Sequence, residues 1–237
     1  DDIGYVEYMT INNMIVLPNS PFSEYDYLLK YGIKTTRTAP LFAHHNQPEH
    51  KLLEEYNLVV TETSSMSFEE YIELNLWKWF MLSTHFLGWT RVVSKYLKDN
   101  GVTYKHFYES LFEYVKKSEN TLLYSEFIKT KKDILNFFMH NSPWGRKVPE
   151  VSNLYWEYEE ATAISIAANK QRFYSELSIY LTREYPNLDI DNIVCIQSDK
   201  MKDPYIDYNG DLEKWCTECM WWGRRVERFF VGEYFDR

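Results

Sequence analysis

The sequence predicts a mainly α-helical, bundle-like domain of about four long helices, with an irregular N-terminal arm and a few short strands. Apolar and aromatic residues recur at helical spacing over most of residues 67–184. The first fifty residues contain Pro18, Pro21, Pro40 and Pro48, which exclude long helices there. With 237 residues, 45% of them hydrophobic, the chain can bury a full core. We expect residues 1–66 to form the arm and residues 67–237 the helical domain with a mixed C-terminal tail, together one structural unit.

Two short apolar runs, Met14–Leu17 and Leu58–Val60, are strand candidates in the arm. The first long helix is expected from Ser67 to about Lys98, with a bend near Gly88 and a stop at Asn100-Gly101. Ser67 and Glu70 have the spacing of a capping box, in which the Ser67 hydroxyl and the Glu70 carboxylate each accept a backbone N–H bond from the other residue.

Three further helices are expected. Thr103 is the predicted cap of the second, whose inward residues are Phe107, Tyr108, Leu111, Phe112 and Val115. The third should run from about Asn120 to His140, and the fourth from Pro149 or Glu150 to Glu184. In the tail, Ile193–Ile196 is a strand candidate, and a short helix is expected near Asp211–Trp222.

Charge and hydropathy exclude several partners. A net charge of -9 disfavours nucleic acid, because phosphate binding needs clustered cations. The most apolar window, Leu74–Trp89, is shorter than the roughly 20 residues that a bilayer span needs, so no membrane is expected. The chain starts at Asp1 without the basic and apolar regions of a secretory signal, which favours a cytoplasmic fragment of a longer protein. The sequence does not indicate an oligomeric state.

No common catalytic motif is found in the sequence. Trp215 and the Cys216–Cys219 segment have the spacing of a thioredoxin-type W-C-x-x-C, but the preceding residues are polar and only 18 residues follow. Free structural cysteines are therefore favoured. The motifs H-E-x-x-H, G-x-S-x-G, G-x-G-x-x-G and the P-loop are absent, as is the E-x-x-H of carboxylate-bridged di-iron bundles. The sequence therefore identifies no catalytic residue.

Three histidines are the one dense group of metal-ligand side chains. His44, His45 and His50, with Glu49, lie within seven residues and could hold a divalent metal. Pro48 interrupts this segment, and histidines in an exposed loop are more often simply solvated. A metal-dependent enzyme that uses these histidines is one open alternative.

A second alternative rests on the aromatic content of 18%, which suits core packing, interfaces and flat-ligand pockets. If a pocket exists, we expect it between the arm and the first and fourth long helices, where polar arm residues face an aromatic wall. The candidate residues are Asn19, Arg37, Thr61, Thr63, Trp77, Tyr155, Trp156 and Glu160. The competing interpretation is that Arg37 and the threonines only satisfy backbone ends at the arm-to-bundle junction.

Several short segments, in order along the chain, resemble the C-terminal region of cobalamin-binding radical S-adenosylmethionine enzymes. Leu17–Pro21 with Tyr31–Ile33 resembles the segment that follows the catalytic barrel. Val59–Ser67 with the helix through Leu87–Arg91 is similar to the next part of that region. Trp222–Arg225 resembles its terminal aromatic-Gly-Arg-basic turn.

This resemblance implies a larger protein with an N-terminal cobalamin-binding domain, a barrel holding a four-iron cluster, and a C-terminal helical region that closes the substrate side. The cluster motif C-x3-C-x2-C is missing here. The chain is thus expected to be the non-catalytic, substrate-side domain, with the upstream catalytic domains of the same protein as partners. The iron–sulfur cluster, S-adenosylmethionine and cobalamin would belong to the parent protein, and no cofactor to this chain. A stand-alone helical binding or scaffold protein with an aromatic docking surface is the main alternative.

Overall fold

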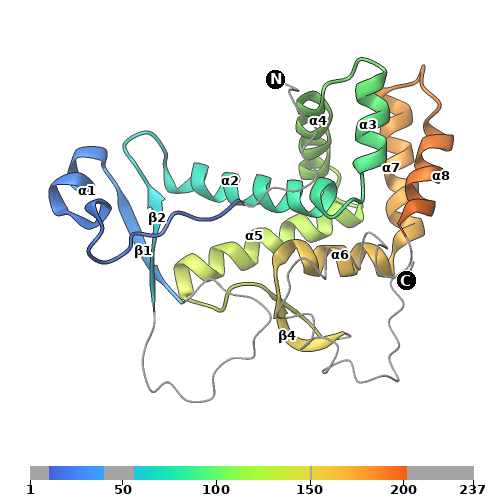
Figure 1. The fold of residues 1–237 in the computed structure, drawn as a ribbon. Coiled ribbons are helices and arrows are strands. Elements are labelled where there is room, and N and C mark those ends of the chain that lie inside the picture. The colour runs from blue at the N-terminus through green and yellow to red at the C-terminus, as the bar shows by residue number, and fades with distance from the viewer. Residues whose placement is uncertain (1–10, 40–55, 150, 202–237) are drawn as a thin grey trace, which may run out of the picture. The chain divides into compact units, whose positions relative to one another are not determined.

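The computed structural model describes residues 11–39, 56–149 and 151–201 (Figure 1). The described part is mainly helical, with short strands in two small sheets, as the sequence predicts. It falls into two compact units. We call residues 11–39, 56–78, 129–149 and 151–158 the strand unit, and residues 79–128 and 159–201 the helical unit.

The strand unit begins with a 3-10 turn, η1 (Pro21–Ser23), and a short helix, α1 (Tyr25–Tyr31). Strands β1 (Lys34–Thr38) and β2 (Asn57–Glu62) then form an antiparallel pair. The predicted strand at residues 58–60 is confirmed as part of β2. The other candidate, residues 14–17, contributes a single bridge from Ile15 to Val59. The first sheet therefore lies in the predicted arm.

Helix α2 (Phe68–Met81) follows β2, and α5 (Leu122–His140) ends close to the predicted His140. The prediction of a fourth helix from residue 149 or 150 is wrong at its start. The chain there forms a hairpin of β3 (Arg146–Val148) and β4 (Ser152–Trp156), and the helix begins at Tyr158. Gly145 explains the difference: its φ of 92° is left-handed, and a Cβ there would collide with the Trp156 carbonyl oxygen.

The helical unit contains the π-turn η2 (Leu82–Phe86) and helices α3 (Arg91–Asp99), α4 (Tyr104–Lys117), α6 (Tyr158–Ala168), α7 (Lys170–Glu184) and α8 (Ile190–Lys200). Helix α3 contacts both α4 and α8, and α8 also contacts α7 (Figure 1). The predicted cap is present, since the Thr103 hydroxyl accepts a bond from the His106 amide at 3.1 Å. All five predicted inward residues of α4 are buried.

Two expectations for this unit change. The long first helix does not continue to Lys98 as one rod; it ends at Met81, and after η2 and Gly88 a new helix starts at Arg91. The strand expected at residues 193–196 is instead part of α8. Its buried side chains are Ile190, Ile193, Val194 and Gln197, which is the helical spacing. Within the described residues no helix is long and apolar enough to span a membrane.

Candidate functional site

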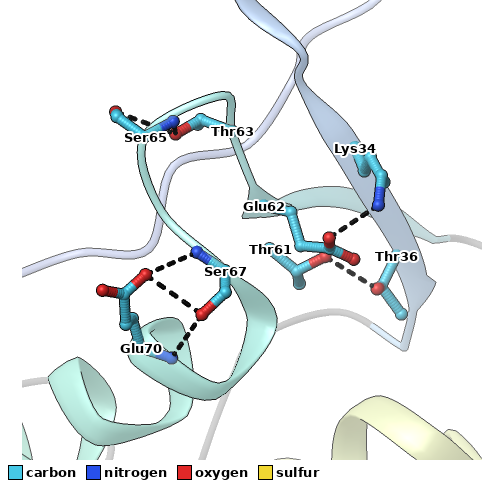
Figure 2. A network of polar contacts seen from close by, with 8 residues as sticks. All are labelled: Lys34, Thr36, Thr61, Glu62, Thr63, Ser65, Ser67 and Glu70. Carbon is cyan, nitrogen blue, oxygen red and sulfur yellow. Dashed lines mark hydrogen bonds and ion pairs between the residues drawn. The ribbon is translucent and has the colours of Figure 1, made fainter.

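Residues 59–71, which include the Val59–Ser67 segment of the resemblance, form a polar junction between β2 and α2 (Figure 2). Strand β2 brings Thr61 beside Thr36 of β1, and the two hydroxyl oxygens lie 3.1 Å apart. At the next position, Lys34 Nζ donates to Glu62 Oε2 at 2.7 Å. The two strands are thus joined by side-chain bonds as well as by their backbone ladder.

A tight turn links this strand to α2. The Thr63 amide donates to the Met66 carbonyl at 2.9 Å, and the Ser65 amide donates to the Thr63 hydroxyl at 3.3 Å. On the other side of the turn, the Ser64 amide donates to the Tyr31 carbonyl at 2.9 Å, which ties α1 to the junction. Gly32 permits this approach, because a Cβ there would lie 3.0 Å from the Ser64 nitrogen.

Ser67 and Glu70 form the predicted capping box (Figure 2). The Glu70 amide donates to Ser67 Oγ at 3.3 Å, and Glu70 Oε2 accepts the Ser67 amide at 2.7 Å and the Ser67 hydroxyl at 3.0 Å. The bond from the Ser67 amide, with help from the Ser67 hydroxyl, lowers the pKa of the Glu70 carboxyl. The junction hydroxyls therefore bind protein groups, which favours a structural role for Thr61 and Thr63.

The other predicted pocket residues have the following positions in the strand unit. Asn19 is exposed, with a left-handed φ of 62°, just before η1. Arg37 is exposed on β1 and stacks over the Tyr56 ring at 4.0 Å. Trp77 is half-buried on α2. Asn19 lies in a turn, Arg37 on β1 and Trp77 on α2, and whether they line one pocket stays a prediction.

Tyr155 and Trp156 are neighbours on β4, so their side chains point to opposite faces of the hairpin. Trp156 is buried, whereas Tyr155 is half-buried beneath Lys147, whose Nζ lies 5.0 Å from the ring centre. Glu160 is buried on α6 of the helical unit.

The metal hypothesis concerns His44, His45 and His50, which lie outside the described residues, as do Cys216 and Cys219. Among the residues that the structure describes, no group of three or more His, Cys, Asp or Glu side chains is placed to hold a metal ion.

Sequence reasoning missed a buried polar network in the helical unit. His85 lies in the π-turn η2, a local distortion that is frequent at functional sites. Its Nδ1 atom is 2.6 Å from the Tyr108 hydroxyl of α4, which is 3.1 Å from the Thr90 hydroxyl. Thr90 donates in turn to the Thr84 carbonyl at 3.0 Å. The signal in the sequence was an ionisable residue inside the most apolar window of the chain.

The proton positions in this network follow from a count of donors. The Thr90 hydroxyl has one proton, which it donates to Thr84. All three bonds are satisfied when Tyr108 donates to Thr90 and His85 Nδ1 donates to Tyr108. An unbroken line of hydrogen bonds then leads from the imidazole to the backbone of the π-turn at Thr84, which is an arrangement that can fix a histidine tautomer or pass a proton.

Helix α8 holds the turn that carries this network. Gln197 Oε1 accepts the Val92 amide at 2.7 Å, and Gln197 Nε2 donates to the Gly88 carbonyl at 3.0 Å. The Tyr174 hydroxyl donates to the Trp89 carbonyl at 3.2 Å, and burial strongly raises the pKa of this phenol. The 88–92 segment is thereby fixed from two helices of the same unit.

The sequence matches no protein-family model. Among curated proteins, it is similar to a cobalamin-dependent radical SAM methyltransferase, TokK, of Streptomyces tokunonensis, with 23% identity over 239 aligned positions. The match covers 90% of this chain and 33% of the relative, so the chain spans about a third of that protein's length. The chain is therefore similar to one region of such an enzyme.

Proposed function

We propose that this chain is the non-catalytic, substrate-side helical domain of a cobalamin-dependent radical S-adenosylmethionine enzyme. The observation that carries the proposal is the similarity to the methyltransferase, which extends over nearly the whole chain but over only a third of the relative. The upstream catalytic domains of the same protein would be its partners. The iron–sulfur cluster, S-adenosylmethionine and cobalamin would be bound by those domains.

The residues that carry the resemblance support a structural role. The segments at residues 31–33 and 59–67 meet through the bond from Ser64 to the Tyr31 carbonyl. The segment at residues 87–91 contains Gly88, with a φ of 89°, and Thr90 of the buried network. These residues lie at turns and near helix starts. The three cysteines, at positions 195, 216 and 219, do not have the C-x3-C-x2-C spacing of a cluster site.

The test compares this chain with its parent protein after iron and sulfide reconstitution under reductant. We expect the isolated chain to form no 5'-deoxyadenosine above a protein-free control, because its cysteines lack the cluster spacing. The parent protein should form it. Formation of 5'-deoxyadenosine by the isolated chain would contradict a non-catalytic role.

A stand-alone binding or scaffold protein is the second candidate. It is favoured by the large apolar side chains that remain exposed near the N-terminus, including Leu17, Tyr25 and Leu29. A stop codon shortly upstream of this chain in the gene would favour this candidate.

A further inference from the structure

Several large apolar side chains are exposed in η1, in α1 and just before η1 in the strand unit. We call Leu17, Phe22, Tyr25, Leu29 and Tyr31 the α1 surface. Tyr25 is 76% exposed, Leu29 67% and Leu17 63%. Helix α1 has seven residues and buries none of them completely. Exposed apolar patches of this kind are typical of interaction sites.

The C-terminal end of α1 is attached to the rest of the strand unit. Gly32 and the Tyr31 carbonyl attach the C-terminal end of the helix to the Ser64 turn. The Tyr27 ring packs against two rings of the α1 surface, Phe22 at 5.1 Å and Tyr31 at 4.6 Å between ring centres. Tyr25 and Leu29, one helical turn apart, therefore share an exposed face of a helix that is anchored at its C-terminal end. A seven-residue helix is marginal alone, so further burial would stabilise it.

We propose that the α1 surface is the docking site for the upstream part of the parent protein, an inference that rests on the proposed function. The chain spans about a third of the relative's length, so most of such a parent would lie outside it. A domain joined at Asp1 would be tethered 16 residues before Leu17, a reach of at most about 55 Å. Such a tether supplies a high effective concentration for a modest apolar contact.

The chemistry of the surface fits a protein partner. Aromatic residues are enriched in the cores of protein interfaces, and three of these five residues are aromatic. The charged residues of the same segment, Glu24, Asp26 and Lys30, are mixed in sign. The expected partner surface is therefore an apolar, weakly charged face of the upstream domains.

Hydroxyl-radical footprinting of the free chain and of the parent protein tests this inference. Leu29 and Ile179 form a matched pair, because both are 67% exposed aliphatic side chains. We expect the modification rate of Leu29 to fall at least fivefold in the parent protein, and that of Ile179 on α7 to change less than twofold. In a parent protein carrying Tyr25→Ser, the modification rate of Leu29 should return to within twofold of its rate in the free chain. In a parent protein carrying Ile179→Ser, the modification rate of Leu29 should remain as low as in the unmodified parent.

Each other result overturns the inference. If the parent protein exists and Leu29 reacts equally fast in it, the docking site is wrong while the proposed function stands. If the modification rate of Leu29 is already low in the free chain, the chain itself covers the α1 surface. If sedimentation shows a concentration-dependent dimer of the free chain that Tyr25→Ser abolishes, the occupant is a second copy. If no parent reading frame exists, both the proposed function and the docking partner are wrong.

Discussion

At the residue scale, Ser67 and Glu70 bind each other reciprocally at the start of α2. The Thr36 and Thr61 hydroxyls share one hydrogen bond across the strand pair, and the Thr63 hydroxyl accepts a bond from the Ser65 amide. The bonds of Thr63, Ser67 and Glu70 satisfy backbone amides at the turn and at the start of α2, where such amides lack helical partners. The junction is therefore specified by a few short side chains.

Replacing Ser67 by Ala removes the side-chain cap and should lower the free energy of unfolding by about 0.5 to 2 kcal/mol. Trp79→Ala should cost more, about 3 to 5 kcal/mol. Trp79 is 2% exposed, and its indole N–H donates to Thr162 Oγ1 at 2.9 Å. Chemical denaturation of both variants measures the difference, and equal midpoints would contradict this ranking.

The Ser67–Glu70 contact also predicts a pH dependence. Because the pKa of Glu70 is lower in the folded chain than in the unfolded chain, its stabilising effect is present above the unfolded value, about 4.3. It is lost as pH falls through the folded value. Glu70→Gln should therefore be less stable than the wild type at pH 7, and the difference in stability should shrink as the pH falls below the unfolded pKa of Glu70. A gap that is unchanged at low pH would show that the charge is not responsible.

At the scale of elements, the interruption between α2 and α3 is the most informative feature. The π-turn ends helix α2, and its residue His85 is hydrogen-bonded to Tyr108 of α4, which also contacts Thr90. Gln197 fixes the next turn from α8. The break is therefore supported by polar contacts from α4 and α8.

Tyr108→Phe tests this support, because it removes the hydroxyl that joins His85 to Thr90. We expect a loss of about 1 to 3 kcal/mol of unfolding free energy from the unsatisfied buried partners. Tyr114→Phe is the matched control on the same helix, since Tyr114 is half-buried and contacts Tyr180 and Arg183 through its ring. Similar losses for the two variants would mean that the network does not stabilise the π-turn.

The β3–β4 hairpin provides a second test at this scale. Gly145 and Gly101 have nearly the same left-handed φ, 92° and 86°. A Cβ at Gly145 would collide with the Trp156 carbonyl oxygen, whereas nothing lies within 4 Å of one at Gly101. Gly101→Ala should cost about 1 to 2 kcal/mol from backbone strain alone, and Gly145→Ala about 1 to 3 kcal/mol more from the collision. Equal costs in thermal unfolding would show that the close approach is unimportant.

At the scale of the whole molecule, the sequence predicts what depends on local spacing. The capping box at Ser67 and the Thr103 cap follow from residues three apart, and α4 and α5 from their apolar periodicity. The hairpin was missed because it depends on distant contacts, such as that of Arg146 with Asp133 at 2.6 Å. Residues 193–196 were misassigned because a short β-branched run suits either structure, and only packing on α3 and α7 decides.

In the candidate site too, the contacts between residues far apart in the sequence could not be predicted. Thr61 and Thr63 were named as pocket residues, which stays a prediction, with a junction role as the competing interpretation. The Thr36 partner of Thr61 is 25 residues away and has no local signal. The His85–Tyr108 contact joins residues 23 apart, on different elements. Such contacts need the fold before they can be recognised.

The central claim is that this chain is one region of a cobalamin-dependent radical S-adenosylmethionine enzyme. The most direct measurement is the sequence of the gene upstream of the codon for Asp1. We predict an open reading frame that continues upstream in the same frame and encodes a C-x3-C-x2-C motif. An in-frame stop codon shortly upstream, with a start codon between it and this chain, would contradict the account.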